Sequence, residues 1–189
     1  LTASLNTKPG LIDDIRPPAS SQIYDINGKL ITNIHSEQNR IPVKLSKVPK
    51  NLQEAFIAVE DARFYQHSGI DPRGILRAVW SNITNRGVAE GGSTITQQLA
   101  KYAYLSQEQT LKRKIQEVFL ALQIERNYTK NEILELYLNQ IYFGQGAYGV
   151  EAASQVYFNQ NVEDITLAEA AMLAGTPKSP NYYSPLDYL

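Results

Sequence analysis

Two adjacent acids, Glu60 and Asp61, lie at a predicted helix end, where a carboxylate could transfer protons. They end a pattern in which Leu52, Phe56 and Val59 would share one apolar face of a helix. At about 100° per residue, Glu60 falls roughly 40° from Phe56, whereas Asp61 points nearly opposite. A carboxyl group beside an apolar surface is harder to ionise, which suits it to proton transfer at neutral pH. The pattern predicts different surroundings for the two acids; the alternative is a helix end with two solvated acids.

Residues 91–98 form a second candidate, because they combine two glycines with hydroxyl and amide side chains ahead of a helical pattern. Ser93 or Thr94 can cap that helix, and Gln97 can close a capping box from three residues on. Free N–H groups and the positive end of the helix dipole would then face an anion, which Lys101 could also reach. The alternative is an ordinary N-cap followed by exposed glutamines.

Three consecutive cations, residues 112–114, form a third candidate on a long predicted helix, with Glu117 four residues after Arg113. Such a cluster is usually a solvated face, where an exposed pair contributes roughly 0.3–0.5 kcal/mol. A functional interpretation needs an anionic ligand, and a polyphosphate fits because Arg and Lys bind it by charge-assisted hydrogen bonds.

Three other features carry weaker signals. Residues 144–149 match the glycine spacing of a dinucleotide-binding loop, but that loop must follow a strand in a βαβ unit, and here a capped helix precedes it. We therefore predict a tight turn between helices. His67 has no partners at triad or metal-ligand spacing, so we expect a hydrogen-bonded structural role. Trp80 is either a core residue or part of a lipid-facing surface.

Length, composition and charge limit the possible classes of protein further. A chain of 189 residues, 43% apolar and 20% charged, can form one ordinary globular domain. Its formal net charge of −1 argues against a general nucleic-acid binder. The absence of cysteine excludes disulfides and thiolate zinc sites. No apolar run approaches about 18 residues, so no segment is expected to span a bilayer. A start at Leu1 rather than Met suggests an excised or processed piece, which a membrane anchor could have preceded.

The first 45 residues differ from the rest. Two strand-like runs, 23–26 and 29–32, flank Asn27-Gly28, which is a strong hairpin signal. After Pro49 the apolar spacing becomes helical almost to the end. We predict a linker with a β-hairpin over residues 1–45 and a mainly α domain over residues 46–189.

Caps and spacing predict the individual helices. Asp71-Pro72 opens one, a second contains the three cations, and capping boxes at 129–132 and 166–169 open two more. The predicted apolar stripes of the first three are Ile75, Leu76, Val79, Trp80 and Ile83; Leu111, Ile115, Val118 and Leu122; and Ile133, Leu134, Tyr137, Leu138 and Ile141.

Four motifs, taken in order, resemble those of glycosyltransferase family 51, the peptidoglycan glycosyltransferases, found alone or as the N-terminal catalytic domain of class A penicillin-binding proteins. The resemblance covers roughly residues 46 to 180. The motifs are Glu60-Asp61-x-x-Phe64-x-x-His67-x-Gly69, Gly92-Ser93-Thr94-Ile95-x-Gln97-Gln98, Arg113-Lys114-x-x-Glu117 and Lys130-x-Glu132-Ile133-Leu134-x-x-Tyr137-Leu138-Asn139.

The resemblance implies a lysozyme-like fold, with a mostly α head lobe and a small membrane-facing jaw lobe between Gly69 and Glu90. It implies polymerisation of lipid II into β-1,4 glycan strands, with inversion at the donor anomeric carbon and release of undecaprenyl pyrophosphate. By the same resemblance, Glu60 is the general base. Glu117 is the second acid, assisting the leaving group with or without a divalent cation, Mg²⁺ or Mn²⁺.

The resemblance also implies that Lys101, Arg113 and Lys114 hold the pyrophosphate. Many members carry an arginine where this chain has Gln109, so one such contact is absent or replaced by a neighbour such as Lys112. The other residues expected to contact substrate are Asp61, Phe64, His67, Ser93, Thr94, Gln97 and Gln98.

The implied partners are lipid II, the nascent glycan and the membrane surface, at the extracytoplasmic face of a bacterial cell membrane, with moenomycin as an inhibitor. A membrane anchor before the chain and a transpeptidase domain after it are both expected; no nucleic acid is. Two other classes stay open. A hydrolase of the lysozyme or lytic transglycosylase type would not need the cations Lys101, Arg113 and Lys114, and a silent module binding anionic lipid or glycan would not need Glu60 or Glu117.

Overall fold

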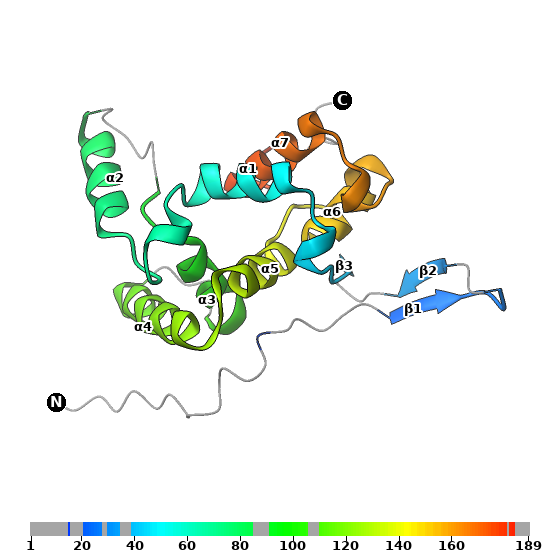
Figure 1. The fold of residues 1–189 in the computed structure, drawn as a ribbon, viewed down its shortest axis with the longest axis horizontal. Helices are drawn as coiled ribbons and strands as arrows, with labels where there is room; N and C mark the ends of the chain where they lie inside the picture. The colour runs from blue at the N-terminus through cyan, green and yellow to red at the C-terminus, as the bar shows by residue number, and fades with distance from the viewer. Residues whose placement is uncertain are drawn as a thin grey trace.

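The computed structural model describes residues 15, 21–27, 30–34, 39–84, 91–105, 110–180 and 182–183. In this part the chain is mainly helical, as predicted, with two two-stranded sheets (Figure 1). The helices are α1 (Lys50–Glu60), α2 (Pro72–Thr84), α3 (Ile95–Tyr104), α4 (Leu111–Asn127), α5 (Lys130–Gln140), α6 (Val150–Phe158) and α7 (Leu167–Gly175), with 3-10 turns η1 (Leu45–Lys47), η2 (Phe64–Gln66), η3 (Val162–Asp164) and η4 (Thr176–Lys178).

The predicted hairpin is confirmed. Strands β1 (Ser21–Tyr24) and β2 (Leu30–Ile34) pair antiparallel. At the turn, the backbone N–H of Asn27 donates to Asp25 Oδ1 at 2.9 Å, an Asx-type contact typical of tight turns. Gly28, the second turn residue of the prediction, lies outside the described residues. Figure 1 shows this hairpin standing apart from the helices.

The segment after the hairpin packs on the helical body. Strand β3 (Asn39–Arg40) pairs in parallel with β4 (Ala147–Tyr148). Asn139 on α5 exchanges two hydrogen bonds with the backbone of Val43, each 2.8 Å long. The boundary predicted between residues 45 and 46 remains a prediction.

Helix α5 forms the centre of the core. Its predicted stripe of Ile133, Leu134, Tyr137, Leu138 and Ile141 is fully buried, which confirms that prediction. Around it, α3 packs against α4 and α5, while α1 packs against α7. This arrangement brings the end of α1, the start of α3 and the segment after α7 together.

The capping boxes predicted for α5 and α7 are formed, as is the one at α3. In each of the first two, a glutamate accepts from the N-cap threonine, and that backbone hydrogen bond lowers the pKa of Glu132 and of Glu169. The cap of α3 is Thr94 rather than Ser93.

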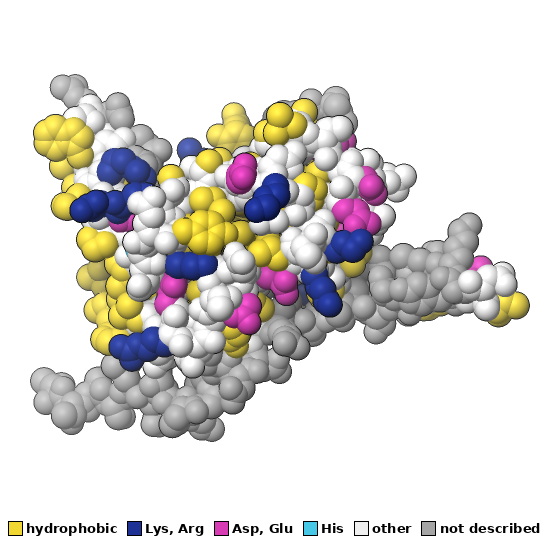
Figure 2. Space-filling model, in the orientation of Figure 1, with side chains coloured by type: hydrophobic (Ala, Val, Ile, Leu, Met, Phe, Trp, Pro, Cys, Tyr) yellow, Lys and Arg dark blue, Asp and Glu magenta, His cyan; other side chains and the backbone are white. Residues whose placement is uncertain are grey.

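Three predicted apolar stripes lie partly outside the core. Val59 on α1 is exposed although Leu52 and Phe56 are buried. On α2, Leu76 and Trp80 are 70% and 71% exposed. Hydrophobic side chains line the edge of the molecule formed by α2 and α4 (Figure 2). Periodicity locates an apolar stripe, but it does not say whether protein or another apolar medium covers it.

Helix α4 shows this most clearly. Leu111 and Ile115, two residues of its predicted apolar stripe, are exposed, whereas the buried face carries Glu117, Ala121 and Ile124. A buried acid on a helix of this length is unusual unless it is paired. It points to a polar cluster beneath α4.

The glycine-rich stretch 144–149 is the tight turn predicted between α5 and α6. Gly144, Gln145, Gly146 and Gly149 all have positive φ. A Cβ at Gly149 would lie 2.9 Å from the carbonyl oxygen of Asn139, so both conformation and space require glycine there.

Within the residues described, no helix combines the length and the apolar character needed to cross a bilayer.

Candidate functional site

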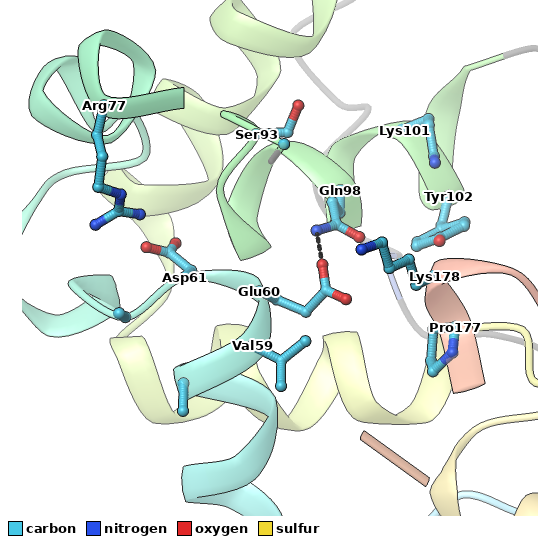
Figure 3. Close-up of a pocket in the computed structure, with 13 residues that line it drawn as sticks. Val59, Glu60, Asp61, Arg77, Ser93, Gln98, Lys101, Tyr102, Pro177 and Lys178 are labelled. Carbon is cyan, nitrogen blue, oxygen red and sulfur yellow. Dashed lines mark hydrogen bonds between the residues drawn. The ribbon is translucent and has the colours of Figure 1, made fainter. Parts of the chain in front are cut away.

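A pocket of about 360 Å³ lies where α1 ends, beside α3 and the segment after α7 (Figure 3). Its charged lining residues are Glu60, Asp61, Arg77, Lys101 and Lys178. These residues come from four separate parts of the chain. A small pocket with convergent charges is the usual form of a ligand site.

Glu60 is the last residue of α1 and is half-buried in this pocket. The amide of Gln98 donates to Glu60 Oε2 at 2.7 Å. Figure 3 shows the Glu60 carboxylate pointing from α1 toward this amide, which belongs to α3. Gln98 is therefore half-buried and bonded to an acid, rather than exposed as the alternative interpretation had it.

Asp61 is buried, which corrects the expectation of an acid pointing away from the apolar face. Its carboxylate lies within 2.9 and 3.0 Å of His67 Nε2 and accepts from the backbone N–H of Ile95 at 3.1 Å. The helical phase does not apply because α1 ends here, with Asp61 at φ −160° and ψ 72°. The anion at the start of α3 is thus the protein's own Asp61.

His67 has the hydrogen-bonded structural role expected for it. Its Nδ1 accepts from the backbone N–H of Gly69 at 3.2 Å, so in the neutral ring Nε2 carries the proton and donates to Asp61. Phe64 is fully buried, with its ring edge-to-face with the His67 ring. Both lie behind the pocket wall, which favours a positioning role over direct substrate contact.

Thr94 and Gln97 hold the entrance of α3. The Thr94 hydroxyl donates to the carbonyl of Gly69 at 2.7 Å and accepts from the backbone N–H of Gln97. The Gln97 side chain in turn accepts from the backbone N–H of Thr94. Both side chains are buried, so they tie the first two motifs together from inside.

The third motif forms the polar cluster beneath α4. Glu117, whose side chain is 3% exposed, lies 2.7 Å from Lys114 Nζ and 3.3 Å from Arg113 Nε. The interpretation as an exposed, weak ion pair is therefore wrong. Lys114 also donates to the hydroxyl of Ser93, at 2.7 Å, and Ser93 lines the pocket.

Lys101 connects the two ends of the site. Burial lowers the pKa of Lys101; the carboxylates of Glu117 and Glu60 oppose that effect, and Arg113 and Lys114 add to it. Because this one ammonium interacts with both acids, Glu60 and the cationic cluster belong to one electrostatic neighbourhood. Its Nζ lies 4.5 Å from the ring centroid of Tyr102.

Sequence reasoning missed Arg77, Tyr102 and Lys178, which also line the pocket. Burial, helped by the charge of Glu60, raises the pKa of Tyr102 to about 12. Tyr102 could have been suspected as the neighbour of Lys101. Lys178 carried no spacing signal, because only the packing of α7 on α1 brings it to the pocket.

The described residues do not offer a ready divalent-cation site. No three acidic or histidine side chains in this part of the chain lie together as ligands. The carboxylate of Glu117 is already engaged by Arg113 and Lys114. Gln109, where a weaker pyrophosphate contact was expected, lies outside the described residues.

Most of this chain is similar in sequence to known proteins. The family profile described as transglycosylase matches residues 27–189. Penicillin-binding protein 1F of Bacillus subtilis is 52% identical over 89% of this chain and 23% of its own length, and penicillin-binding protein 1A of Escherichia coli is 52% identical over 93% and 20%. A solved structure of penicillin-binding protein 1A from Haemophilus influenzae aligns with 90% of this chain and 16% of its own, at 30% identity and a TM-score of 0.44.

The chain thus spans about a fifth to a quarter of the length of the curated relatives named above. Half of the residues are identical across that span, and the family profile covers most of the chain, including all four motifs. The chain therefore belongs to the transglycosylase family, glycosyltransferase family 51, whose members are peptidoglycan glycosyltransferases.

Proposed function

We propose that this chain polymerises lipid II into β-1,4 glycan strands, with inversion at the donor anomeric carbon and release of undecaprenyl pyrophosphate. The observation that carries the proposal is the pairing, in one site, of a held carboxylate with a cluster of cations. Glu60 is fixed by Gln98, and Lys101 lies within electrostatic reach of Glu60 and of the Arg113 and Lys114 cluster.

Glu60 acts as the general base. Gln98 holds Oε2, and the described residues place no other hydrogen bond on this carboxylate. Glu60 takes the proton from the 4-hydroxyl of the acceptor sugar as that oxygen bonds to the donor anomeric carbon. The bond from that carbon to the pyrophosphate oxygen breaks, and its electron pair leaves with the pyrophosphate. Attack opposite the leaving group inverts the anomeric carbon.

The cations stabilise the leaving pyrophosphate. Glu117 fixes Arg113 and Lys114 in place, so these cations need little reorganisation when negative charge develops. Lys101 is partly desolvated, and the described residues give its ammonium no hydrogen bond or ion pair, so a bound anion would offset the cost of burying it. Glu117 then assists departure of the leaving group by orienting these cations.

We further propose that α2 belongs to the small membrane-facing lobe of a lysozyme-like fold, with the rest of the helices in the head lobe. Its exposed apolar residues include Leu76, Val79, Trp80 and Ile83. A lipid-linked substrate must enter from a bilayer, and this surface would place the pocket beside it. The protein would then lie at the extracytoplasmic face of the cell membrane, with an anchor and a transpeptidase domain outside this chain.

The direct test of this mechanism is Glu60→Gln, which keeps the shape of the side chain and removes its basicity. We expect turnover of lipid II to fall at least about 10²-fold, the lower end for loss of a general base. Glu54→Gln, on an exposed part of the same helix, is the matched control and should retain full activity. Near-normal polymerisation by folded Glu60→Gln would remove Glu60 from the mechanism.

A further inference from the structure

Tyr137 has a buried hydroxyl group that the mechanism above does not use. Its side chain is fully buried, and Oη has no hydrogen-bond partner among the described residues. A buried hydroxyl without a partner costs about 1–3 kcal/mol, so such a group usually has a function or an ordered water. The fourth motif contains this residue, yet the proposed function gives it no role.

The Tyr137 ring reaches the active-site end of α1 from α5. It packs edge-to-face against Phe56, with ring centroids 6.2 Å apart. Phe56 lies four residues before Glu60 on the same helix, and residues at this spacing lie on one face. The buried phenol and the proposed base are therefore neighbours along one side of α1.

The nearby acceptors differ in what they already bind. The Asp61 carboxylate is occupied by His67 and by the backbone N–H of Ile95. Among the described residues the Glu60 carboxylate accepts one hydrogen bond, from Gln98 to Oε2, which leaves Oε1 as the acceptor open to a further donor. No direct hydrogen bond joins Tyr137 to Glu60, so a hydrogen-bonded link between these two groups requires a bridging water.

The phenol is also a permanent donor. Burial raises the pKa of Tyr137 well above its ordinary value, and the charge of Glu60 adds more to that effect than Tyr102 or Asp61 does. The hydroxyl thus stays protonated across the working pH range, and Glu60 is the charge it interacts with most.

We propose that Tyr137 is a positioning residue for Glu60, donating to its carboxylate through one buried water in the wall of the pocket. The inference rests on the proposed function, in which Glu60 is the base. With Gln98 on Oε2 and this water on Oε1, the carboxylate is held from two sides while one lone pair faces the acceptor hydroxyl. A hydrogen bond donated to a carboxylate favours its ionised form.

The test is the pH profile of kcat/KM for lipid II in Tyr137→Phe, which retains the packing against Phe56 and removes only the hydroxyl. We expect kcat/KM at neutral pH to fall about tenfold, as for one hydrogen bond to a charged group. The acid limb of the profile should move to higher pH by about half a unit or more. The other titratable groups around Glu60, namely Asp61, Arg77, Lys101, Tyr102 and Lys178, stay in place.

Tyr157→Phe is the matched control, since Tyr157 donates its hydroxyl to the carbonyl of Phe143 at 2.7 Å and does not line the pocket. It should lose stability and leave the profile unchanged. An unshifted acid limb in Tyr137→Phe, with kcat/KM within about twofold of wild type, would overturn the inference.

Two further measurements test the bridging water and separate the role of Tyr137 from that of Glu60. A high-resolution crystal structure of the wild-type chain should show a water within hydrogen-bond distance of both Tyr137 Oη and Glu60; its absence overturns the inference even if Tyr137→Phe does not fold. If Glu60→Gln polymerises lipid II normally, the proposed base fails and the Tyr137 role fails with it. If Glu60→Gln is inactive and Tyr137→Phe has the wild-type profile, only the Tyr137 role fails.

Discussion

At the scale of single residues, the site divides by burial rather than by motif. Glu60, Gln98 and Lys101 line the pocket and are partly exposed, Asp61 lines it from a buried position, and Phe64 is buried outside it. The motif residues thus include some that can meet a substrate and some that hold those residues in place. Substitutions should separate the two groups, because the first changes kinetics and the second changes stability.

Lys101→Ala should weaken donor engagement, raising KM for lipid II about tenfold as a charge-assisted hydrogen bond to phosphate is lost. Because burial lowers the pKa of Lys101, donor affinity of the wild type should also fall as pH rises through that lowered value. Lys101→Arg, which stays charged, should bind the donor without that alkaline loss.

Lys50→Ala removes the same charge from an exposed position ten residues before Glu60 on α1 and serves as the control. Steady-state kinetics with lipid II on folded protein checks both variants. Unchanged kinetics in Lys101→Ala would contradict the pyrophosphate role.

At the scale of elements, the sequence predicted where the helices lie along the chain better than which of their faces are buried. The capping boxes at Thr129 and Thr166 and the core stripe of α5 were right, because local backbone chemistry and a central helix leave little choice. The stripes of α2 and α4 are partly exposed. The sequence left Trp80 of α2 open between the core and a lipid-facing surface, since an apolar stripe looks the same whether protein or lipid covers it.

The candidate site was predictable to a similar extent. Glu60, Lys101 and Glu117 could be named from motif residues, whereas Lys178 and Arg77 could not, because they reach the pocket only through long-range packing. The burial of Asp61 escaped prediction because helical phasing fails at the residue where the helix ends.

Asp61→Asn tests how α1 and α3 are joined. The amide replaces Oδ1 or Oδ2 by an NH2 group. With its oxygen bonded to the Ile95 N–H at the Oδ2 position, the NH2 would lie 3.0 Å from Nε2 of His67, so two buried donors would face each other. We expect a loss of about 2–3 kcal/mol in the free energy of unfolding. Chemical denaturation checks it, with the exposed Asp164→Asn as control, expected within about 0.5 kcal/mol of wild type. Equal stability of the two variants would show that Asp61 is not a structural junction.

At the scale of the whole molecule, the edge formed by α2 and α4 sets how the protein meets its surroundings. Figure 2 shows hydrophobic side chains along that edge, and the exposed residues of α2 account for part of it. Exposed apolar residues gathered on one helix mark a surface that another apolar phase covers. The lipid-linked substrate proposed above makes the bilayer the expected phase.

Trp80→Ser should reduce partitioning of the chain onto liposomes about tenfold, since burial of a large aromatic side chain in the interface is lost. Leu167→Ser is the control, because Leu167 is 70% exposed against 71% for Trp80 but lies on α7. Co-sedimentation with vesicles measures both. Equal partitioning of wild type and Trp80→Ser would count against the membrane-facing role of α2.

The most direct test of the account is incubation of the purified chain with labelled lipid II, followed by separation of the products by size. A base beside clustered cations predicts polymeric glycan together with undecaprenyl pyrophosphate. Hydrolysed disaccharide without polymer would instead identify a hydrolase, and bound but unconverted lipid II would identify a binding module; either result would contradict the proposed transfer.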